Sequence, residues 1–491
     1  MARASIALKR PLDWRVIVAF ASLIAVGLYL LIGAMMIRVG FPLDDTWIHL
    51  TYARNFAEHG EWAFRLGEQS AGSTSPLWTL LLSIGYLIRL APYGWTFFLG
   101  WLMLTLLAIF AEASARKLLA GYQPRIPWIG IFFAFAWHLA WAATSGMETL
   151  LHALLIFLVL TSLIGDSRRY SMLGLLAGLS VWVRPDGATL LGPILFTIVL
   201  TENNWNSRGR SALSVLIGFG ALFLLYLLFN LALSGNPMPN TFYAKQAEYQ
   251  TVWLGQPLKD RLMEYLAPIF ASPFIALFPG VLVWVGGAIR NRNWGALAGV
   301  IWFVGYILIY FLRLPPYQHG RYIIPAFPIL YLWGLLGMAG FMLNAKSNPR
   351  LKFLWKTLVA VLLVFFLILG GLQNAKDVFW VESEMVATAE WVKQNIPPDA
   401  ILAVHDIGAM GYFVSNPLVD LAGLVDPGVI PFIRDEPSLA IYLNDRAIGY
   451  LIVPPGFYKE LIENREILFV AGGDTSSAKP DEHMLVLKWK R

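Results

Sequence analysis

Long apolar stretches, each about as long as a membrane span, alternate with short polar linkers over most of the chain. A helix needs about 20 mostly apolar residues to cross the hydrocarbon core of a bilayer. We therefore expect about eleven spans, several of them short and closely spaced. They cover residues 14–37, 95–115, 126–144, 147–165, 170–184, 187–201, 211–234, 265–288, 295–313, 321–344 and 353–373. No small-residue cleavage site is obvious after the basic N-terminus, so we interpret the first stretch as a retained span.

The last part of the chain is more polar and has a different pattern. Residues 382–394 have a helix-like pattern, which Pro397 and Pro398 interrupt. Short strand-like runs follow at 400–404, 449–453, 467–470 and 484–487. Alternating strand and helix signals predict a small soluble domain. The expected fold is an all-α multi-span membrane bundle over residues 1–374, with a C-terminal soluble α/β domain over residues 375–491.

Composition agrees with a membrane protein. Of the 491 residues, 57% are hydrophobic and 14% are charged, whereas a soluble domain carries roughly a quarter charged residues. The net charge of +6 therefore reports first on membrane orientation and does not indicate a nucleic-acid partner. Because the chain has no cysteine, disulfides, thiolate catalysis and cysteine metal sites are excluded.

The basic linkers decide the expected orientation, because Lys and Arg concentrate in cytoplasmic loops. The apolar segment 76–90 is short for a span. If it lies at the interface, all the basic linkers fall on the cytoplasmic side, and we choose this arrangement. These linkers are the N-terminus, 116–125, 168–169, 208–210, 290–292 and 346–352. The tail and the loops rich in Asp, Glu, His, Gly and Pro then face the periplasm or the exterior of a plasma (inner) membrane.

Two adjacent carboxylates, Asp44 and Asp45, follow the first span. Such carboxylates lose hydration beside a bilayer and repel each other, so at least one is expected to have a raised pKa. A carboxylate there is suited to accept a proton from a sugar hydroxyl. The spacing of Asp45, His49 and Tyr52 places them on one helix face. The alternative is a helix cap, and one carboxylate can cap while the other acts as the base.

Other acidic residues at the outer side have a structural and a functional interpretation. Glu148 either caps the helix that it begins or contacts substrate. Arg184 and Asp186 join two short spans, either as a tight turn with an internal ion pair or as part of a site. In the tail, His405 and Asp406 follow a strand-like run. A lone His–Asp pair is poor evidence for a metal, which needs three or four ligands.

Basic residues on the outer side are unexpected from topology alone. Lys245, His319 and Arg321 lie in such loops, and Gly320 would allow close backbone approach. Arginine presents a planar fork of donors that matches a phosphate. We interpret these residues, with Tyr322, as contacts for a lipid phosphate head group. The alternative is that they anchor the chain at the membrane surface by snorkelling.

The ordered set of these motifs resembles the GT-C superfamily of integral-membrane glycosyltransferases, and within it the branch with mycobacterial terminal arabinosyltransferases. The resemblance extends over nearly the whole chain. The motifs that carry it are residues 43–55, 72–78, 145–148, 184–187, 237–245, 320–322 and 420–424.

The resemblance implies an inverting transfer outside the cytoplasm, from a polyprenyl-phosphate-linked sugar to a glycan, lipid or protein acceptor. Asp44 or Asp45 would be the catalytic carboxylate, and Lys245, His319 and Arg321 would contact the lipid phosphate. Arabinosyl transfer to a cell-wall polysaccharide is suggested by the nearest branch alone. Residues expected to contact substrate are His49, Tyr52, Glu148, Arg184, Asp186 and Asp406.

Further partners expected are membrane lipids, and no nucleic acid. Some members of the family bind a divalent cation, but no metal site can be assigned to residues of this sequence. A multi-pass transporter of a lipid-linked or small polar substrate is the alternative function. A transporter would show internal repeats and ionisable residues within its spans, whereas this sequence has no visible repeat and few mid-span charges.

Overall fold

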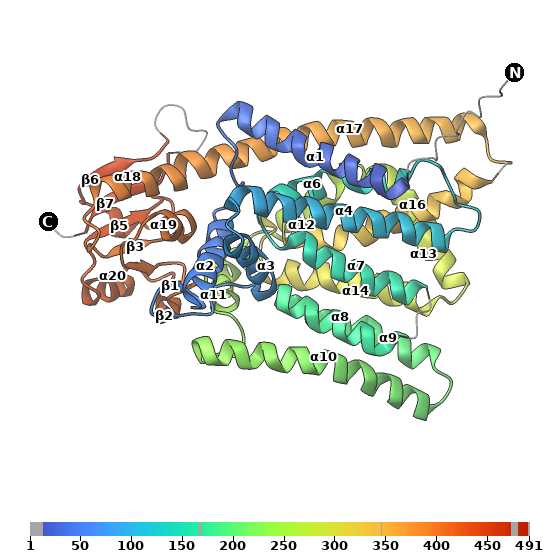
Figure 1. Cartoon of the computed structure of the whole chain (residues 1–491), viewed down its shortest axis with the longest axis horizontal. Helices are drawn as coiled ribbons and strands as arrows, with labels where there is room; N and C mark the ends of the chain where they lie inside the picture. Colours follow the sequence, from blue (N-terminus) through green and yellow to red (C-terminus); the bar gives the residue numbers. More distant parts are fainter. Residues whose placement is uncertain (1–12, 166–168, 345, 473–479, 490–491) are drawn as a thin grey trace, which may run out of the picture.

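A helical bundle with a small mixed domain at one end makes up the molecule (Figure 1). The computed structural model describes residues 13–165, 169–344, 346–472 and 480–489. The basic N-terminus and Arg168, which entered the orientation argument, lie outside the described residues.

Helices of very different length form the bundle. The longer ones are α1 (Trp14–Met36), α4 (Pro92–Leu118), α10 (Trp205–Ser234), α13 (Phe274–Arg290), α14 (Trp294–Arg313), α16 (Phe327–Leu343) and α17 (Pro349–Trp380). The shorter ones are α2 (Asp45–His59), α3 (Pro76–Leu87), α5 (Trp128–Phe135), α6 (Trp137–Thr144), α7 (Thr149–Ile164), α8 (Tyr170–Val183), α9 (Leu191–Thr201), α11 (Asn240–Gly255) and α12 (Leu258–Phe270). Single turns are η1 (Pro185–Leu190), α15 (Tyr317–Gly320) and η2 (Ile324–Ala326).

The structure confirms a multi-pass membrane bundle but not the predicted count of about eleven spans. In the described part of the chain, six helices are long and apolar enough to cross a membrane, or seven if α12 and α13, bent by 94°, form one span. Length is the reason for the difference. Helices α7 and α8 and the segment Pro185–Thr201 are apolar but shorter than a span. The predicted span 126–144 is divided into α5 and α6 at Ala136, whose ψ of 114° is not helical.

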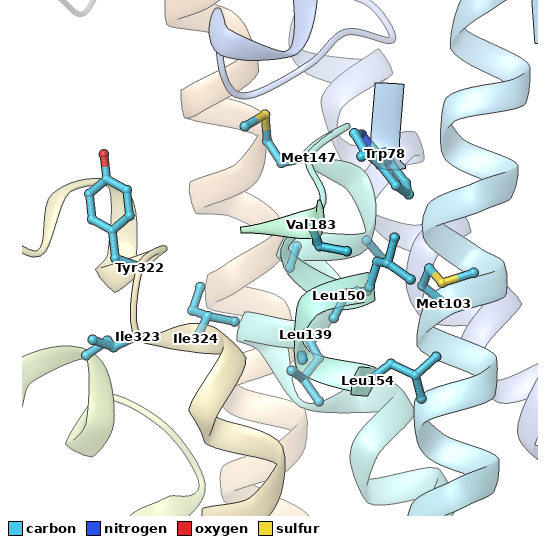
Figure 2. Packing of buried hydrophobic residues seen from close by; sticks show 14 of the residues in the cluster. Trp78, Met103, Leu139, Met147, Leu150, Leu154, Val183, Tyr322, Ile323 and Ile324 are labelled. Atoms are coloured by element: carbon cyan, nitrogen blue, oxygen red, sulfur yellow. The ribbon is translucent and has the colours of Figure 1, made fainter. Parts of the chain in front are cut away.

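The core of the bundle lies where α4, α6, α7 and α8 meet, and Figure 2 shows part of it. Leu139, Leu150 and Leu154 are buried there. Close helix approach depends on small residues, as is usual in membrane bundles. A Cβ atom on Gly100 would lie 1.9 Å from the carbonyl oxygen of Ala143. This dense core fixes the loops at the end of the bundle that faces the small domain.

The C-terminal domain is built on a five-stranded mixed sheet with the order β4-β3-β5-β7-β6. Strand β3 pairs in parallel with β4 and β5, and β7 pairs antiparallel with β5 and β6. The strands are β3 (Leu402–Val404), β4 (Leu418–Asp420), β5 (Tyr450–Val453), β6 (Ile467–Val470) and β7 (Leu485–Lys488). The helices are α18 (Ala387–Asn395), α19 (Ile407–Phe413), η4 (Pro427–Phe432), α20 (Glu436–Asp445) and α21 (Lys459–Ile462).

Four of the five strands agree with the predicted runs, and the small sheet is present as expected. Strand β4 was not predicted, because it has only two apolar residues, Leu418 and Val419, between Pro417 and Asp420, whereas β3 lies in a longer apolar run. The hairpin of β1 (Ala63–Arg65) and β2 (Glu68–Gln69) was not predicted either.

Helix α17 runs from the bundle into the small domain without a break. It continues through a π-helical turn, η3 (Val381–Val386), into α18, so that residues Pro349–Asn395 form one rod. The predicted domain boundary after residue 374 therefore falls inside a continuous helix, and the division stays a prediction. Glu384 in the turn accepts hydrogen bonds from the backbone N–H of Met484, at 3.0 Å, and from His483. Glu382 pairs with Arg38 after α1.

Helices α2 and α19 form a second link between the bundle and the domain. The carboxylate of Asp44 accepts the backbone N–H groups of Gly408 at 2.7 Å and Ala409 at 2.8 Å, at the start of α19. At the other end of α19, Arg54 donates to the carbonyl oxygen of Tyr412 at 3.0 Å. The acceptor oxygens of Asp44 satisfy free N–H groups at the start of α19, and the positive charge of Arg54 complements the helix dipole at its other end. Helix α2 therefore holds α19 at both ends.

The contact of α19 with Asp44 predicts a strict need for glycine at position 408. A Cβ atom there would lie 2.1 Å from the Asp44 carbonyl oxygen and 2.5 Å from its Oδ2. We expect Gly408→Ala to destabilise the protein by about 1–3 kcal/mol, as overpacking generally does. The measurement is the thermal unfolding midpoint in detergent. Gly449→Ala in the same domain is the matched control, because its nearest neighbour would be 3.8 Å away. Equal midpoints for the two variants would contradict the account.

Candidate active site

A cavity of about 400 Å³ opens at the end of the bundle next to the C-terminal domain. Helix α2, the start of α7, η1, α11, the end of α14 and the turn before η2 surround it. Most of the predicted site residues, although far apart in the sequence, meet in its lining. They are Asp45, His49, Glu148, Arg184, Asp186, Lys245, Arg321 and Tyr322.

Asp45 forms the centre of a partly buried ion cluster. Its Oδ2 lies 2.7 Å from Arg321 Nη2 and 3.6 Å from Lys245 Nζ. The hydroxyl of Tyr322 accepts from Arg321 at 3.1 Å and from Lys245 at 3.3 Å. Burial alone would raise the pKa of Asp45, but the positive charges of Lys245 and Arg321 outweigh it and hold that pKa well below its usual range. Asp45 is therefore ionised at neutral pH.

Asp44, the neighbouring carboxylate, behaves in the opposite way. Burial, and after it the charge of Asp406, raises the pKa of Asp44 to about 8, although the N–H groups of Ala409 and Gly408 act against this. Asp44 is not among the residues that line the cavity. The two adjacent carboxylates thus differ in role: Asp44 caps a helix of the small domain, and Asp45 faces the cavity.

Arg321 has donors left over after it pairs with Asp45. Its side chain is 9% exposed, and its Nε and Nη1 have no hydrogen-bond partner in the described part of the chain. Buried donors without partners cost free energy, so each one in a native structure needs an explanation. The guanidinium therefore presents two N–H directions that suit an anionic ligand in the cavity.

A second polar cluster lines the cavity around Arg184. The guanidinium lies 3.0 Å from Glu148 and 3.3 Å from Asp186. The hydroxyls of Tyr306 and Tyr310 each donate to Asp186 Oδ2 at 2.7 Å. The internal ion pair foreseen as the structural alternative for Arg184 and Asp186 is present, and it is part of the cavity wall.

His49 connects the two clusters. Its Nε2 lies 3.7 Å from Glu148 Oε2, and its Nδ1 is within 3.2 Å of the hydroxyls of Thr79 and Ser73. Glu148 Oε2 is buried and makes no hydrogen bond to the described residues. One carboxylate oxygen of Glu148 therefore remains available beside the cavity, while the other is bound to Arg184.

Four predicted site residues are not in the cavity lining. Asp44 binds α19, as described above. The hydroxyl of Tyr52 bonds to Ser70 and to the backbone N–H of Gly72. His319 Nε2 lies 2.8 Å from Asp377 on α17, so its ring is already engaged away from the cavity. Asp406 lies near enough to Asp45 to interact with its charge. Burial, and after it the negative charge of Asp45, raises the pKa of Asp406 to about 7.

The structure also shows cavity residues that were not predicted. Tyr310, Arg313 and Gln246 line it, and Arg313 donates to Gln246 at 2.9 Å. Tyr306 and Tyr310 are four residues apart on α14, so they share a face. This spacing of four residues could have indicated that the two tyrosines act together. Aromatic residues that face lipid on other spans have the same spacing, so it does not distinguish a site.

The described residues do not offer a divalent-cation site. They contain no group of three or more His, Cys, Asp or Glu placed to hold a metal ion. Moreover, the carboxylates of Asp45, Glu148 and Asp186 are each paired with an arginine or a lysine. A set of carboxylates neutralised in this way does not fit a cation that prefers free oxygen ligands.

Comparisons with known proteins show which solved structures share the fold of this chain. A family model described as a domain of unknown function (DUF8728) matches residues 376–481. The search of curated proteins finds no match. ArnT from Cupriavidus metallidurans bound to undecaprenyl phosphate superposes with a TM-score of 0.59 and 16% identity, over 96% of this chain and 97% of that chain. Its apo form gives a TM-score of 0.60 with 14% identity, over 95% and 97% of the two chains.

A further solved structure has the same general arrangement. The arabinofuranosyltransferase AftD from Mycobacteria matches 96% of this chain but 40% of its own length, with a TM-score of 0.50 and 14% identity. Identities this low establish the fold only. The chain therefore has the fold of ArnT, the GT-C fold that its sequence motifs indicated.

Proposed function

We propose that this protein is an inverting membrane glycosyltransferase that moves a sugar from a polyprenyl-phosphate donor to an acceptor outside the cytoplasm. The observation that supports this most strongly is the pairing of one cavity carboxylate, Asp45, with Arg321 and Lys245. The proposed base, Asp45, is thus in direct contact with two cations, Arg321 and Lys245. An acceptor hydroxyl and a leaving phosphate need this combination.

The donor phosphate would bind to Arg321 and Lys245. Guanidinium groups bind a phosphate through two parallel hydrogen bonds. Each such pair of donors in Arg321 includes Nη2, so the phosphate would replace Asp45 at Nη2 and also accept from Nε or Nη1, which have no partner among the described residues. ArnT, whose fold this chain has, is solved with undecaprenyl phosphate. Much of the cavity lining is apolar, and it includes Ile309 on α14, which is 42% exposed. Such a lining suits the lipid chain of the donor.

Phosphate binding would also change Asp45. Its pKa is held low by the two cations, which makes it a weak base in the free protein. An anionic phosphate that takes up the charge of Arg321 and Lys245 would raise this pKa towards the usual value. Asp45 therefore becomes an effective base only when donor is bound, which limits unproductive chemistry before the donor arrives.

The transfer itself then needs one proton acceptor and one charge-stabilising group. Asp45 takes the proton of the acceptor hydroxyl, and the oxygen attacks the anomeric carbon from the face opposite the phosphate. The bond between the anomeric carbon and the phosphate oxygen breaks, and the configuration inverts. The negative charge that develops on the leaving lipid phosphate is stabilised by Arg321 and Lys245.

The second cluster suits the sugar. Glu148 offers a free carboxylate oxygen, and His49, Arg184 and Asp186 complete a wall of donors and acceptors. Such groups hydrogen-bond sugar hydroxyls and orient the anomeric carbon. Because AftD is an arabinofuranosyltransferase, an arabinosyl donor belongs in the panel of donors to be tested.

The arrangement of the linkers supports an active site outside the cytoplasm. The small domain, α2 and α11 lie at one end of the bundle, and the linkers between α9 and α10 and between α16 and α17 lie at the other (Figure 1). Near this second end lie Arg208 and Arg210 at the start of α10, Lys346 before α17, and Arg350 and Lys352 at the start of α17. Such residues are typical of cytoplasmic loops.

The roles of the two adjacent carboxylates predict different effects of the same substitution. We expect Asp45→Asn to lower kcat by about 10²–10⁴-fold, the usual contribution of a general base. Because Arg321 loses its competing partner, this variant should bind undecaprenyl phosphate at least as tightly as wild type. Asp44→Asn should lower the unfolding temperature and retain most turnover. The measurement is sugar transfer in nanodiscs with a panel of polyprenyl-phosphate sugars.

Two outcomes of that assay oppose the proposal. Full activity of Asp45→Asn would remove the carboxylate mechanism. Tight donor binding by wild type without transfer to any acceptor would favour a transporter instead.

The electrostatic coupling predicts a pH effect at Lys245. In wild type, Asp45 stays ionised well below neutral pH because its pKa is lowered. Removing one cation in Lys245→Gln disfavours the carboxylate form, so the pKa of Asp45 rises and protonation removes the base at higher pH. We expect the acid limb of the kcat/KM profile to move to higher pH, and Lys245→Arg to keep the wild-type limb. Identical limbs in all three proteins would show that Asp45 is not the titrating base.

A further inference from the structure

The chain makes a left-handed turn directly before Arg321. Gln318 has φ 50° and ψ 63°, His319 has φ 63° and ψ 23°, and Gly320 has φ 77°. Three consecutive residues in this region are unusual, because only glycine enters it without a steric penalty. The turn is thus energetically unfavourable at two of its three positions.

Unfavourable backbone of this kind persists only where the surroundings enforce it, and it gathers at functional sites. Glycine at position 320 is enforced by packing as well as by φ, since a Cβ atom there would lie 2.9 Å from Pro268. Gln318 is exposed. The contacts that hold the turn must therefore come mainly from His319.

The ring of His319 is held by α17 and α6. Its Nε2 lies 2.8 Å from Asp377 Oδ2, and it packs edge-on against Trp137 and Trp141. Trp141 also donates to Asp377, at 2.9 Å. This carboxylate is fixed further by Gln373, at 3.0 Å. The imidazole is therefore held by residues of α6 and α17 that are not in the cavity lining.

The turn determines where the next two residues point. Arg321 and Tyr322 follow it directly and enter the cavity, where both bind the cluster of Asp45 and Lys245. Ile323 and Ile324, next in the chain, are buried in the bundle core (Figure 2). The segment is thus fixed at both ends, by His319 before the pair and by the isoleucines after it.

We propose that His319 is a positioning residue, which holds the left-handed turn through Asp377 and so aims Arg321 at the donor phosphate. This inference rests on the proposed function for its ligand. It revises the sequence-based expectation that His319 itself contacts the phosphate, because the ring faces α17 and is not in the cavity lining. The long rod of α17 then contributes to the donor site without touching the donor.

Two substitutions at position 319 separate positioning from direct contact. Alanine removes the imidazole and keeps the steric penalty of the turn, whereas glycine removes the imidazole and the penalty together. We expect His319→Ala to raise the donor KM, and the dissociation constant for undecaprenyl phosphate, by roughly 10- to 100-fold, with a smaller effect on kcat. His319→Gly should recover much of this loss. If the imidazole bound the phosphate, both variants would be impaired equally, and the proposal would fail.

A structural measurement keeps this inference separate from the proposed function. Cryo-EM of His319→Ala without any ligand is expected to show the turn relaxed and Arg321 beyond hydrogen-bond distance of Asp45. An unchanged turn, with the ion pair of Arg321 intact, would overturn the inference whatever the protein binds. Conversely, a relaxed turn in a protein whose wild type does not bind undecaprenyl phosphate would refute the proposed ligand and leave the positioning role standing. Gln318→Gly, which relieves strain without touching Asp377, is the control and should bind donor like wild type.

Discussion

The partly buried ion cluster of Asp45, Arg321 and Lys245 is the interaction on which the rest of the site depends. Charges removed from water must be paired, or their burial becomes very costly. The three residues come from α2, the turn before η2, and α11, so their pairing brings three distant parts of the chain to one cavity. In the proposed function, the unpartnered donors of Arg321 allow the cluster to exchange the carboxylate for a phosphate.

Asp44 and Asp45 are adjacent in the chain but contact different parts of the molecule, and their roles differ for this reason. Because Asp44 binds the first N–H groups of α19, the small domain fixes the start of α2. Asp45 is the first residue of α2, directly after Asp44, so the same contact helps to fix its position. The C-terminal domain thus helps to orient the proposed base, and the continuous helix α17 supports the opposite wall through His319.

The sequence predicted the multi-pass bundle and four strands of the small domain, and most of the site residues that it predicted line the cavity. The sequence did not predict which residues that are far apart in the chain contact each other. Nothing local distinguishes Asp44 from Asp45, since the difference is made by Gly408, more than 360 positions away. His319 looked like a phosphate ligand because its socket, Asp377 and Trp141, lies on other helices. Tyr306 and Tyr310 were hidden among many membrane aromatics. The count of about eleven spans is not confirmed, because several of the apolar helices are shorter than a span.

The central claim is that the cations paired with Asp45 form the donor phosphate site, and a structure of the protein with undecaprenyl phosphate tests it most directly. The account predicts phosphate density within hydrogen-bond distance of Arg321 and Lys245, with Asp45 separated from both and facing the space for the acceptor. Phosphate density elsewhere, with the ion pair between Asp45 and Arg321 unchanged, would contradict it.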